Sequence, residues 1–478
     1  MESKHPKALP WLTFSYIFFM AGFGGILASL VLYQTDVLKV SVDQAYGIFG
    51  AAMALFWIFP LGGGYLAAKF GYAHSAGVGL IFCALGLAVL SFQMFWAFYL
   101  GLALFVVGNG FATPSIWCMV DHCYSKTSDL RESGFTLFYL FFNLGGIFGI
   151  FFGGFLASVF SFSFEFAFDA LCLFISFCVF QIAAKKMVPH KGRTVRPQLE
   201  WEPKKLLGSA ILISAIAVPI AMFLFQNITI NNILTVLLFL SVTGVLIGIG
   251  LKQKQAFARN QMFAFISLVW IGVIFWTLYS LEPSFLSVFV EHNVDRHFLG
   301  IDIPAASFLA FDGVFVFLIG LILSRVWVIL SKRRQNLSLP TKFSSSLIII
   351  GCGFCLLALA IHLGGPQLLP GRYIVFAYAF FAFAELLIGP LGTAMVGRLA
   401  PEGWEGLMMG FWQLSVGLGG VVAAYVAMFP HLPSHAEPLS ISNPVYFATF
   451  FAVGLISLFA GLLAFLFKPK LKQLIVET

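Results

Sequence analysis

The sequence predicts an all-α membrane protein with about fourteen transmembrane helices, and three observations lead to that prediction. Mean hydropathy is +0.96 and 60% of the residues are hydrophobic. Only 10% are charged, whereas soluble globular chains are about one quarter charged. Apolar runs recur along the whole chain, and each is long enough to cross a bilayer as a helix. A transmembrane β-barrel would show short alternating segments instead of these continuous runs.

Short polar stretches, many with Gly or Pro, separate the apolar runs and set the expected helix limits. The first run is not a cleaved signal peptide, because it is too long and lacks a cleavage pattern of small residues. The expected helices are 10–34, 43–69, 73–92, 95–121, 131–159, 163–184, 206–226, 231–251, 262–290, 304–330, 344–363, 371–399, 404–428 and 444–467.

The basic residues orient the chain. With both termini in the cytoplasm, only Lys39, Arg296 and Arg372 of the 27 Lys and Arg residues fall on the outer side. The cytoplasmic loops of membrane proteins carry an excess of Lys and Arg. We therefore expect a multi-pass protein of a bacterial inner (plasma) membrane with both termini cytoplasmic. The net charge of +7 then reflects topology, and nucleic-acid binding is not expected.

The basic stretch 185–205 divides the chain. Residues 1–184 form an N-terminal bundle of six expected helices, and residues 252–478 form a C-terminal bundle of six. Between them, residues 206–251 form an apolar hairpin with an uncharged turn, which we interpret as a peripheral, lipid-facing pair. Two six-helix halves joined by a basic linker are typical of secondary transporters, whose substrate sites lie between the halves near the midplane.

Three carboxylic acids lie well inside expected helices, where ionisable side chains are costly and are functional candidates. They are Glu385, Asp312 and Glu282, and no buried basic partner accompanies them. A carboxylic acid in that setting tends to hold its proton. It could bind and release a proton as access alternates, or pair with a cationic substrate; the alternative is a neutral acid that only joins helices. Glu165 and Asp169 lie nearer the outer end of their helix.

Four further polar or aromatic residues are weaker candidates for contacting a substrate, because ordinary packing explains each of them equally well. These are Asn143, Trp412, Thr113 and Trp57.

An enzyme is not expected, because the chain has no histidine cluster, nucleophile motif or phosphate-binding loop. Cys352 and Cys355 form a C-x-x-C pattern, but no second ligand pair accompanies it. We therefore predict no catalytic residue, no metal site and no cofactor.

Several short motifs also occur in order along the chain: LVLY at 30–33, GNG at 108–110 followed by Pro114, DLRESGFTLFY at 129–139, NLG at 143–145, NVDR at 293–296, IPA at 303–305, ELLIGPLG at 385–392 and GLMMG at 406–410. They resemble the motifs of the proton-dependent oligopeptide transporters, a branch of the major facilitator superfamily. The resemblance covers the whole chain. It implies the major facilitator fold, two six-helix bundles with an inserted hairpin that is typical of bacterial members.

The departures from the family concern charge, beginning with the N-terminal half. The family's E-x-x-E-R-F motif, which couples proton and peptide, falls on Tyr16, Phe19 and Met20 here. A family Arg on the same helix falls on Leu27, and the Lys after the GNG motif falls on Thr113. The resemblance therefore implies that the cationic group for a peptide's carboxylate is absent.

The C-terminal half departs less from the family. A family Glu falls on Ser280, and Glu282 lies two residues further on, roughly 200° around a helix. Glu282 is thus no simple replacement unless Pro283 distorts the local register. A family Asn becomes Asp312, while Glu385 is retained and by resemblance would meet a peptide's amino group.

Asn143 and Trp412 are retained as well. Our leading hypothesis is a secondary active transporter that works by alternating access and imports peptides or peptide-like, amine-bearing metabolites. Protons would be coupled through Glu385, Asp312 or Glu282. The alternatives are a non-peptide cargo, such as a siderophore or another metabolite, imported or exported, and a non-transporting sensor on the same fold. We expect a monomer in a lipid bilayer with a small-molecule substrate.

Overall fold

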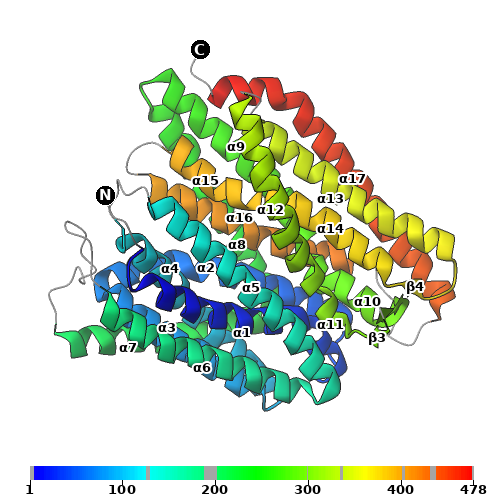
Figure 1. The fold of residues 1–478 in the computed structure, drawn as a ribbon, viewed down its shortest axis with the longest axis horizontal. Helices are drawn as coiled ribbons and strands as arrows, with labels where there is room; N and C mark the ends of the chain where they lie inside the picture. The colour runs from blue at the N-terminus through cyan, green and yellow to red at the C-terminus, as the bar shows by residue number, and fades with distance from the viewer. Residues whose placement is uncertain are drawn as a thin grey trace. The chain divides into compact units, whose positions relative to one another are not determined.

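The structure is a computed structural model that describes residues 5–124, 130–187, 202–298, 300–333, 337–400, 404–430 and 438–475. Within these ranges, 14 helical spans are long and apolar enough to cross a membrane. The predicted all-α membrane fold and the predicted number of helices are therefore confirmed (Figure 1).

Most helices keep close to the predicted limits, but three expected helices (262–290, 304–330 and 371–399) are interrupted and the last one is longer than expected. The helices are α1 Leu9–Asp36, α2 Val42–Phe70, α3 Tyr72–Leu90, α4 Phe95–His122, α5 Leu130–Val159, α6 Phe162–Lys186, α7 Pro203–Gln226, α8 Ile228–Lys252, α9 Ala256–Tyr279, the π-helix η1 Glu282–Leu286, α10 Ser287–Asn293, α11 Ala305–Phe308, α12 Ala310–Lys332, α13 Leu339–Gly364, α14 Arg372–Leu386, α15 Gly389–Leu399, α16 Glu405–Met428 and α17 Leu439–Ile475.

Four two-residue strands near the ends of helices were not predicted. Strand β1 (Val294–Asp295) pairs in parallel with β4 (Leu369–Pro370), and β2 (His297–Phe298) pairs antiparallel with β3 (Ile301–Asp302). The pairs satisfy backbone groups of the segments that connect the helices.

The chain divides into two compact units. Unit 1 comprises Met1–Val40 and Leu55–Ile228, and unit 2 comprises Ser41–Ala54 and Thr229–Thr478. Helix α2 thus contributes to both units, and α7 and α8 fall in different ones. Most of the expected linker, residues 188–201, lies outside the described part of the chain.

In unit 1, helix α1 packs against α5 and α6, and glycines line its contact with α5. A Cβ atom on Gly145 would lie 2.2 Å from the carbonyl oxygen of Ile17, and one on Gly149 would lie 1.8 Å from that of Ala21. Small residues allow membrane helices to approach until their backbones touch. The α1–α5 contact therefore depends on these glycines.

In unit 2, α13 lies alongside α17 (Figure 1), again at backbone distance. A Cβ on Gly351 would lie 3.0 Å from the carbonyl oxygen of Gly454. A second close contact joins α16 to α9, where a Cβ on Gly419 would lie 2.6 Å from the Cβ of Trp276. The candidate site described below includes residues of α9, and the packing of α9 against α16 fixes their position.

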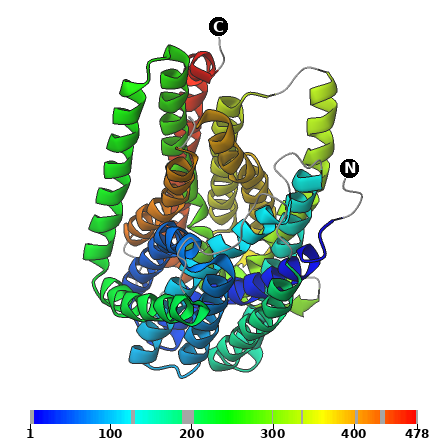
Figure 2. The same ribbon diagram turned by 90° about the vertical axis from the view of Figure 1, so that its left-hand side faces the viewer.

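Outward faces of several helices are apolar, as a lipid environment requires. Helix α8 is the upright green helix at the left of Figure 2, and Leu237, Leu240 and Val245 on it are 48–54% exposed. Its other face packs in unit 2, where the Phe239 ring lies 4.7 Å from that of Phe411. The exposed side chains would be stable only against lipid.

The glycine contact gives a direct stability test. Gly149→Ala should lower the melting temperature of the detergent-solubilised protein, because the new methyl group meets the Ala21 carbonyl and overpacking costs about 1–3 kcal/mol. Gly208→Ala is the matched control, since nothing lies within 4 Å of its added Cβ. Equal melting temperatures for the two variants would show that the α1–α5 contact is looser than described.

Candidate functional site

Unit 2 contains a cluster of three buried or half-buried acids around one tyrosine. The hydroxyl oxygen of Tyr279, the last residue of α9, lies 2.8 Å from Asp312 Oδ2 on α12 and 3.1 Å from Glu385 Oε2 on α14. Glu282 belongs to η1, immediately after α9, and the charges of Asp312 and Glu385 act on it. The structure thus brings together all three predicted proton-coupling candidates. We call this group the acid cluster.

Pro283 explains how Glu282 joins the cluster. Proline lacks an N–H group and its ring clashes with the carbonyl one turn earlier, so an α-helix cannot continue through it unchanged. Helix α9 ends at Tyr279, and the chain continues as the π-helix η1, in which the Leu286 N–H donates to the Leu281 carbonyl at 2.8 Å. The register distortion considered from the sequence is present, and the expectation of one regular helix over 262–290 was wrong.

Glu385 lies at a second interruption. One helix was predicted over 371–399, but α14 ends at Leu386 and α15 begins at Gly389, with Pro390 in its first turn. The Ile388 N–H bonds back to the carbonyl of Glu385 at 3.0 Å. Interrupted membrane helices of this kind line binding sites in many transporters.

The geometry of Tyr279 leaves one hydroxyl proton for two acids. A phenol carries one O–H and can donate to one acceptor at a time, yet two carboxyl oxygens lie within hydrogen-bonding distance of it. Both contacts are hydrogen bonds only when one carboxyl group is protonated and donates to the phenol oxygen. The cluster is therefore completed either by a proton on one carboxyl group or by a donor from a ligand.

No positive charge balances these acids within the described ranges. Neither oxygen of Glu282 has a hydrogen-bond partner there, and neither does Asp312 Oδ1. The ion pairs in the same ranges involve other residues. Glu282 is fully buried and Asp312 is 6% exposed, whereas Glu385 is only half-buried. Isolated carboxylates are costly in such surroundings, so the cluster favours either protons or an ammonium group.

Trp412 lies in the same unit, but its side chain is buried among other residues and is not exposed to a cavity or solvent. It is 2% exposed, and a Cβ on Gly392 or Gly272 would lie 1.9 Å or 2.7 Å from its ring. The ring of Trp276 connects it to the acid cluster, with centroids 6.3 Å from Trp412 and 5.6 Å from Tyr279. The ring of Trp276 therefore lies between Trp412 and Tyr279.

In unit 1, an aromatic group occupies the positions where the family has charges. Trp117 Nε1 donates to the hydroxyl of Tyr16 at 3.2 Å, and that hydroxyl lies 3.4 Å from Thr113 Oγ1. The rings of Phe138 and Phe142 pack 5.1 and 5.4 Å from that of Tyr16. This aromatic group offers neutral hydrogen-bonding groups and ring faces where the sequence comparison expects cations.

The other two candidates of unit 1 make local contacts. Asn143 donates from Nδ2 to the Tyr139 carbonyl of its own helix at 2.8 Å. Trp57 packs edge-on against Phe56 at 5.3 Å, and its indole nitrogen has no acceptor among the described residues. The six predicted substrate contacts are thus distributed over both units, with Glu385, Asp312 and Trp412 in unit 2 and the others in unit 1.

Sequence reasoning missed the central residue, Tyr279, and the neighbouring Trp276. Tyr378 of α14, which is 1% exposed, is also close enough for the charges of Glu282 and Asp312 to act on it. Tyr279 lies three residues before Glu282, one turn earlier on the chain. That spacing was the available signal, since residues three apart on a helix share a face.

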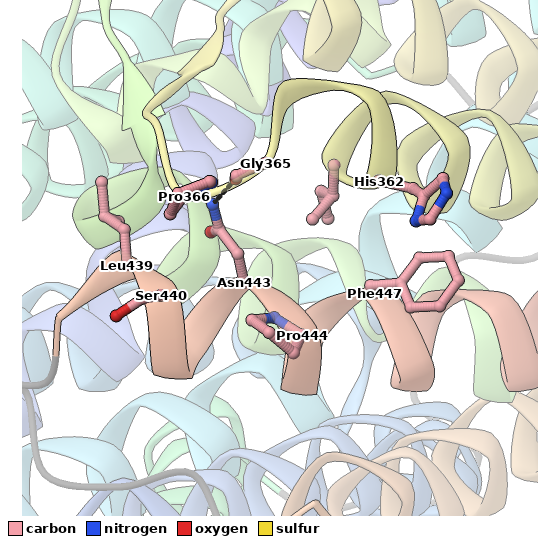
Figure 3. A pocket seen from close by; sticks show the side chains of 9 residues that line it. His362, Gly365, Pro366, Leu439, Ser440, Asn443, Pro444 and Phe447 are labelled. Atoms are coloured by element: carbon pink, nitrogen blue, oxygen red, sulfur yellow. Dashed lines mark hydrogen bonds between the residues drawn. The ribbon is translucent and has the colours of Figure 1, made fainter.

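A separate cavity of about 320 Å³ in unit 2 contains none of these residues (Figure 3). It lies between the end of α13 and the start of α17 and includes His362 and Phe447. Asn443 in its wall donates to the carbonyls of Gly365 and Gln367 at 2.8 and 3.0 Å. Its hydrogen bonds therefore hold the two helix ends together, which is a structural role.

Fourteen apolar spans with buried acids inside one unit are typical of a multi-pass membrane transporter. The sequence profile of the POT family (PTR2) matches residues 75–442, so this chain belongs to the POT family. The predicted family is confirmed, and membership makes the chain a transporter rather than an enzyme.

Individual relatives agree over nearly the full length. The chain is 28% identical over 480 residues to dipeptide and tripeptide permease B of Xenorhabdus bovienii (strain SS-2004), covering 99% of this chain and 97% of the relative. It is also 28% identical over 483 residues to dipeptide and tripeptide permease A of Yersinia pestis, covering 98% and 94%.

Solved structures confirm the fold. The peptide transporter POT in complex with sulfate superposes with a TM-score of 0.84 at 23% identity, covering 99% of this chain and 97% of that one. A POT family transporter in complex with 5-aminolevulinic acid gives a TM-score of 0.84 at 19% identity, covering 99% of this chain and 98% of that one.

The hydroxyl of Tyr279 should contribute measurably to stability. Tyr279→Phe removes the group between Asp312 and Glu385, and hydrogen bonds to charged groups contribute about 1.5–3 kcal/mol. We expect a lower melting temperature in detergent for this variant. Tyr65→Phe is the control, because Tyr65 is 64% exposed. If both variants melt together, the Tyr279 hydroxyl makes no effective bond to the acids.

Proposed function

We propose that this protein is a proton-coupled secondary transporter that imports peptides or peptide-like, amine-bearing metabolites by alternating access. The observation that carries the proposal is the single hydroxyl of Tyr279 between the carboxyl groups of Asp312 and Glu385, without a neighbouring cation in the described part of unit 2. The names of its relatives, dipeptide and tripeptide permeases, support peptides as the cargo class.

An amino group fits the chemistry of the acid cluster. An ammonium group offers three N–H donors, and Asp312 Oδ1 and both oxygens of Glu282 lack donors among the described residues. The ammonium neutralises one carboxylate, and the remaining acids keep protons. Cargo and proton can therefore be bound together, as symport requires. Glu385, the most accessible of the three acids, is the first contact we propose for the cargo.

The other end of the cargo meets different chemistry. A peptide carboxylate would need a cation, and the positions that carry charge in the family hold Tyr16, Phe19, Met20, Leu27 and Thr113 here. An unpaired buried charge costs several kcal/mol. We therefore propose a preference for cargoes whose far end is neutral, such as amides, esters or modified peptides. The same reasoning disfavours polycarboxylates such as siderophores.

We further propose that the protein lies in a bacterial inner membrane with both termini in the cytoplasm. The distribution of Lys and Arg supports this orientation, and the bacterial origin of its relatives supports the membrane. The monomeric state stays a prediction.

Glu385→Gln should abolish proton-driven uptake of a labelled dipeptide into proteoliposomes, because the amide can neither release a proton nor pair with an ammonium group. We expect a loss of at least about tenfold, which corresponds to only 1.4 kcal/mol. Asp302→Asn is the control in the same unit, since Asp302 makes an exposed pair with His297 that contributes about 0–1 kcal/mol. Undiminished, pH-dependent uptake by Glu385→Gln would refute the assignment.

The charge distribution also predicts which end of a peptide is recognised. C-terminally amidated dipeptides should compete with labelled cargo within about threefold of the free acids, whereas N-acetylated ones should compete at least about tenfold more weakly. Competition by both series measures this directly. Stronger binding of free acids than of amides would reveal a cation that the described residues do not supply. Absence of any transport would favour the sensor hypothesis.

A further inference from the structure

Unit 1 has its own pair of buried acids, which the proposed function does not use. Glu165 and Asp169 lie on α6, four residues apart, so their side chains leave the same face of the helix one turn from each other. Both are fully buried, with no exposed surface. Asp169 lies about 6 Å further along the helix than Glu165, and about 10 Å from its first residue.

The pair has one donor for four carboxyl oxygens. Ser29 of α1 donates from Oγ to Glu165 Oε1. Glu165 Oε2 and both oxygens of Asp169 have no hydrogen-bond partner among the residues that the structure describes, and the charge of Glu165 acts on Asp169. The large majority of buried side-chain polar atoms have a hydrogen-bond partner in native proteins. Simple packing therefore does not explain this pair.

Glycines hold the space that the two side chains occupy. A Cβ on Gly25 of α1 would lie 2.3 Å from Asp169 Oδ2 and 2.5 Å from Oδ1, and a Cβ on Gly153 of α5 would lie 3.0 Å from Glu165 Oε1. Both carboxyl groups thus point from α6 toward α1, where any larger residue at position 25 would displace Asp169. The site is enclosed by three helices.

The described side chains of α1, α3 and α5, the helices that pack on α6, include no Lys or Arg. Lys185 and Lys186 lie on α6 itself, but about 24 Å along the helix from Asp169. Cys172 is the ionisable neighbour on which the charge of Asp169 acts. The described titratable groups on these helices are Tyr16, Tyr33 and Asp36 on α1, Tyr72, His74 and Cys83 on α3, Tyr139 on α5, and Cys172, Cys178, Lys185 and Lys186 on α6.

Two carboxylates one turn apart, removed from water and without a cation, cannot both be ionised, so the pair holds a proton. We propose that Glu165 and Asp169 form a proton-binding site of unit 1 and carry one transported proton per cycle. The carboxylate of the pair takes up the proton, and the acid releases it when α1 moves away. This inference rests on the proposed function. It gives unit 1 a coupling site away from Tyr16, Phe19 and Met20.

Asp169→Asn tests the proposal in proteoliposomes with a proton gradient of one pH unit. One coupled proton fewer should lower the accumulation ratio of labelled peptide by about tenfold, because one pH unit is a tenfold factor per proton. Counterflow, the exchange of labelled for unlabelled peptide, needs no net proton movement and should stay within about twofold of the wild type. Glu202→Gln is the matched control, because Glu202 is exposed and makes no capping bond.

The outcomes separate this inference from the proposed function. If the wild type neither accumulates nor exchanges peptide, the proposed function fails. If the wild type transports and Asp169→Asn accumulates as well as it does, the proton site is refuted. The proton site is also refuted if a sodium gradient can drive peptide accumulation by the wild type in place of the proton gradient but cannot do so for the variant.

A second measurement does not depend on transport. Infrared difference spectra of the purified protein between acid and alkaline buffer should contain a carboxylic C=O band that Asp169→Asn removes and Glu202→Gln leaves unchanged. Should Asp169→Asn fold poorly, Glu165→Gln serves in both measurements. A titrating spectrum identical in wild type and variant would overturn the proposal.

Discussion

The organisation of this protein depends on one constraint, which is that carboxyl groups without cations have been removed from water. In unit 2 the constraint is met by the hydroxyl of Tyr279, which lies between Asp312 and Glu385. Because one hydroxyl proton cannot serve two carboxylates, a further proton or an ammonium group has to complete the arrangement. Under the proposed function, the ligand is therefore part of the electrostatic balance of the unit, and its release is accompanied by another change of charge. That linkage is the physical basis of coupled transport.

Breaks in regular backbone geometry occur next to two of the acids of the cluster. The π-helix that follows Tyr279 begins at Glu282, and the break after Leu386 comes one residue after Glu385. Irregular backbone is tolerated at membrane depth only inside protein or beside a water-filled space. Both interruptions occur next to an acid. The proline and glycine residues that cause them, Pro283 and Gly389-Pro390, thus have a positional role rather than a packing role.

Hydropathy predicted the helices because each span must be apolar along its length. Glu385, Asp312 and Glu282 were predicted as functional candidates because an ionisable side chain inside a membrane helix is costly. Tyr279 was not predicted because its role depends on its contacts with acids on two other helices, which the sequence alone does not give. From the sequence, Glu165 and Asp169 were weaker candidates for a functional role because they lie near a helix end. Their burial depends on the space that Gly25 leaves on α1, a helix far away in the sequence. Interruptions at single residues, such as the one after Leu386, were hidden within continuous apolar runs.

The energetics of buried ion pairs explain why the aromatic group of unit 1 contains no charged residue. Removing one member of a buried charge set leaves the others unpaired and costs about 3–5 kcal/mol, whereas replacing the whole set by packed apolar residues is often neutral or stabilising. Tyr16, Phe19, Met20, Leu27 and Thr113 are all uncharged. Here Tyr16 packs against Phe138 and Phe142 and accepts a hydrogen bond from Trp117, so its polar group is satisfied without any ion. Joint replacement thus allows unit 1 to stay stable without the first-helix charges that the resemblance implies, and the coupling proton proposed for this unit resides elsewhere, on Glu165 and Asp169.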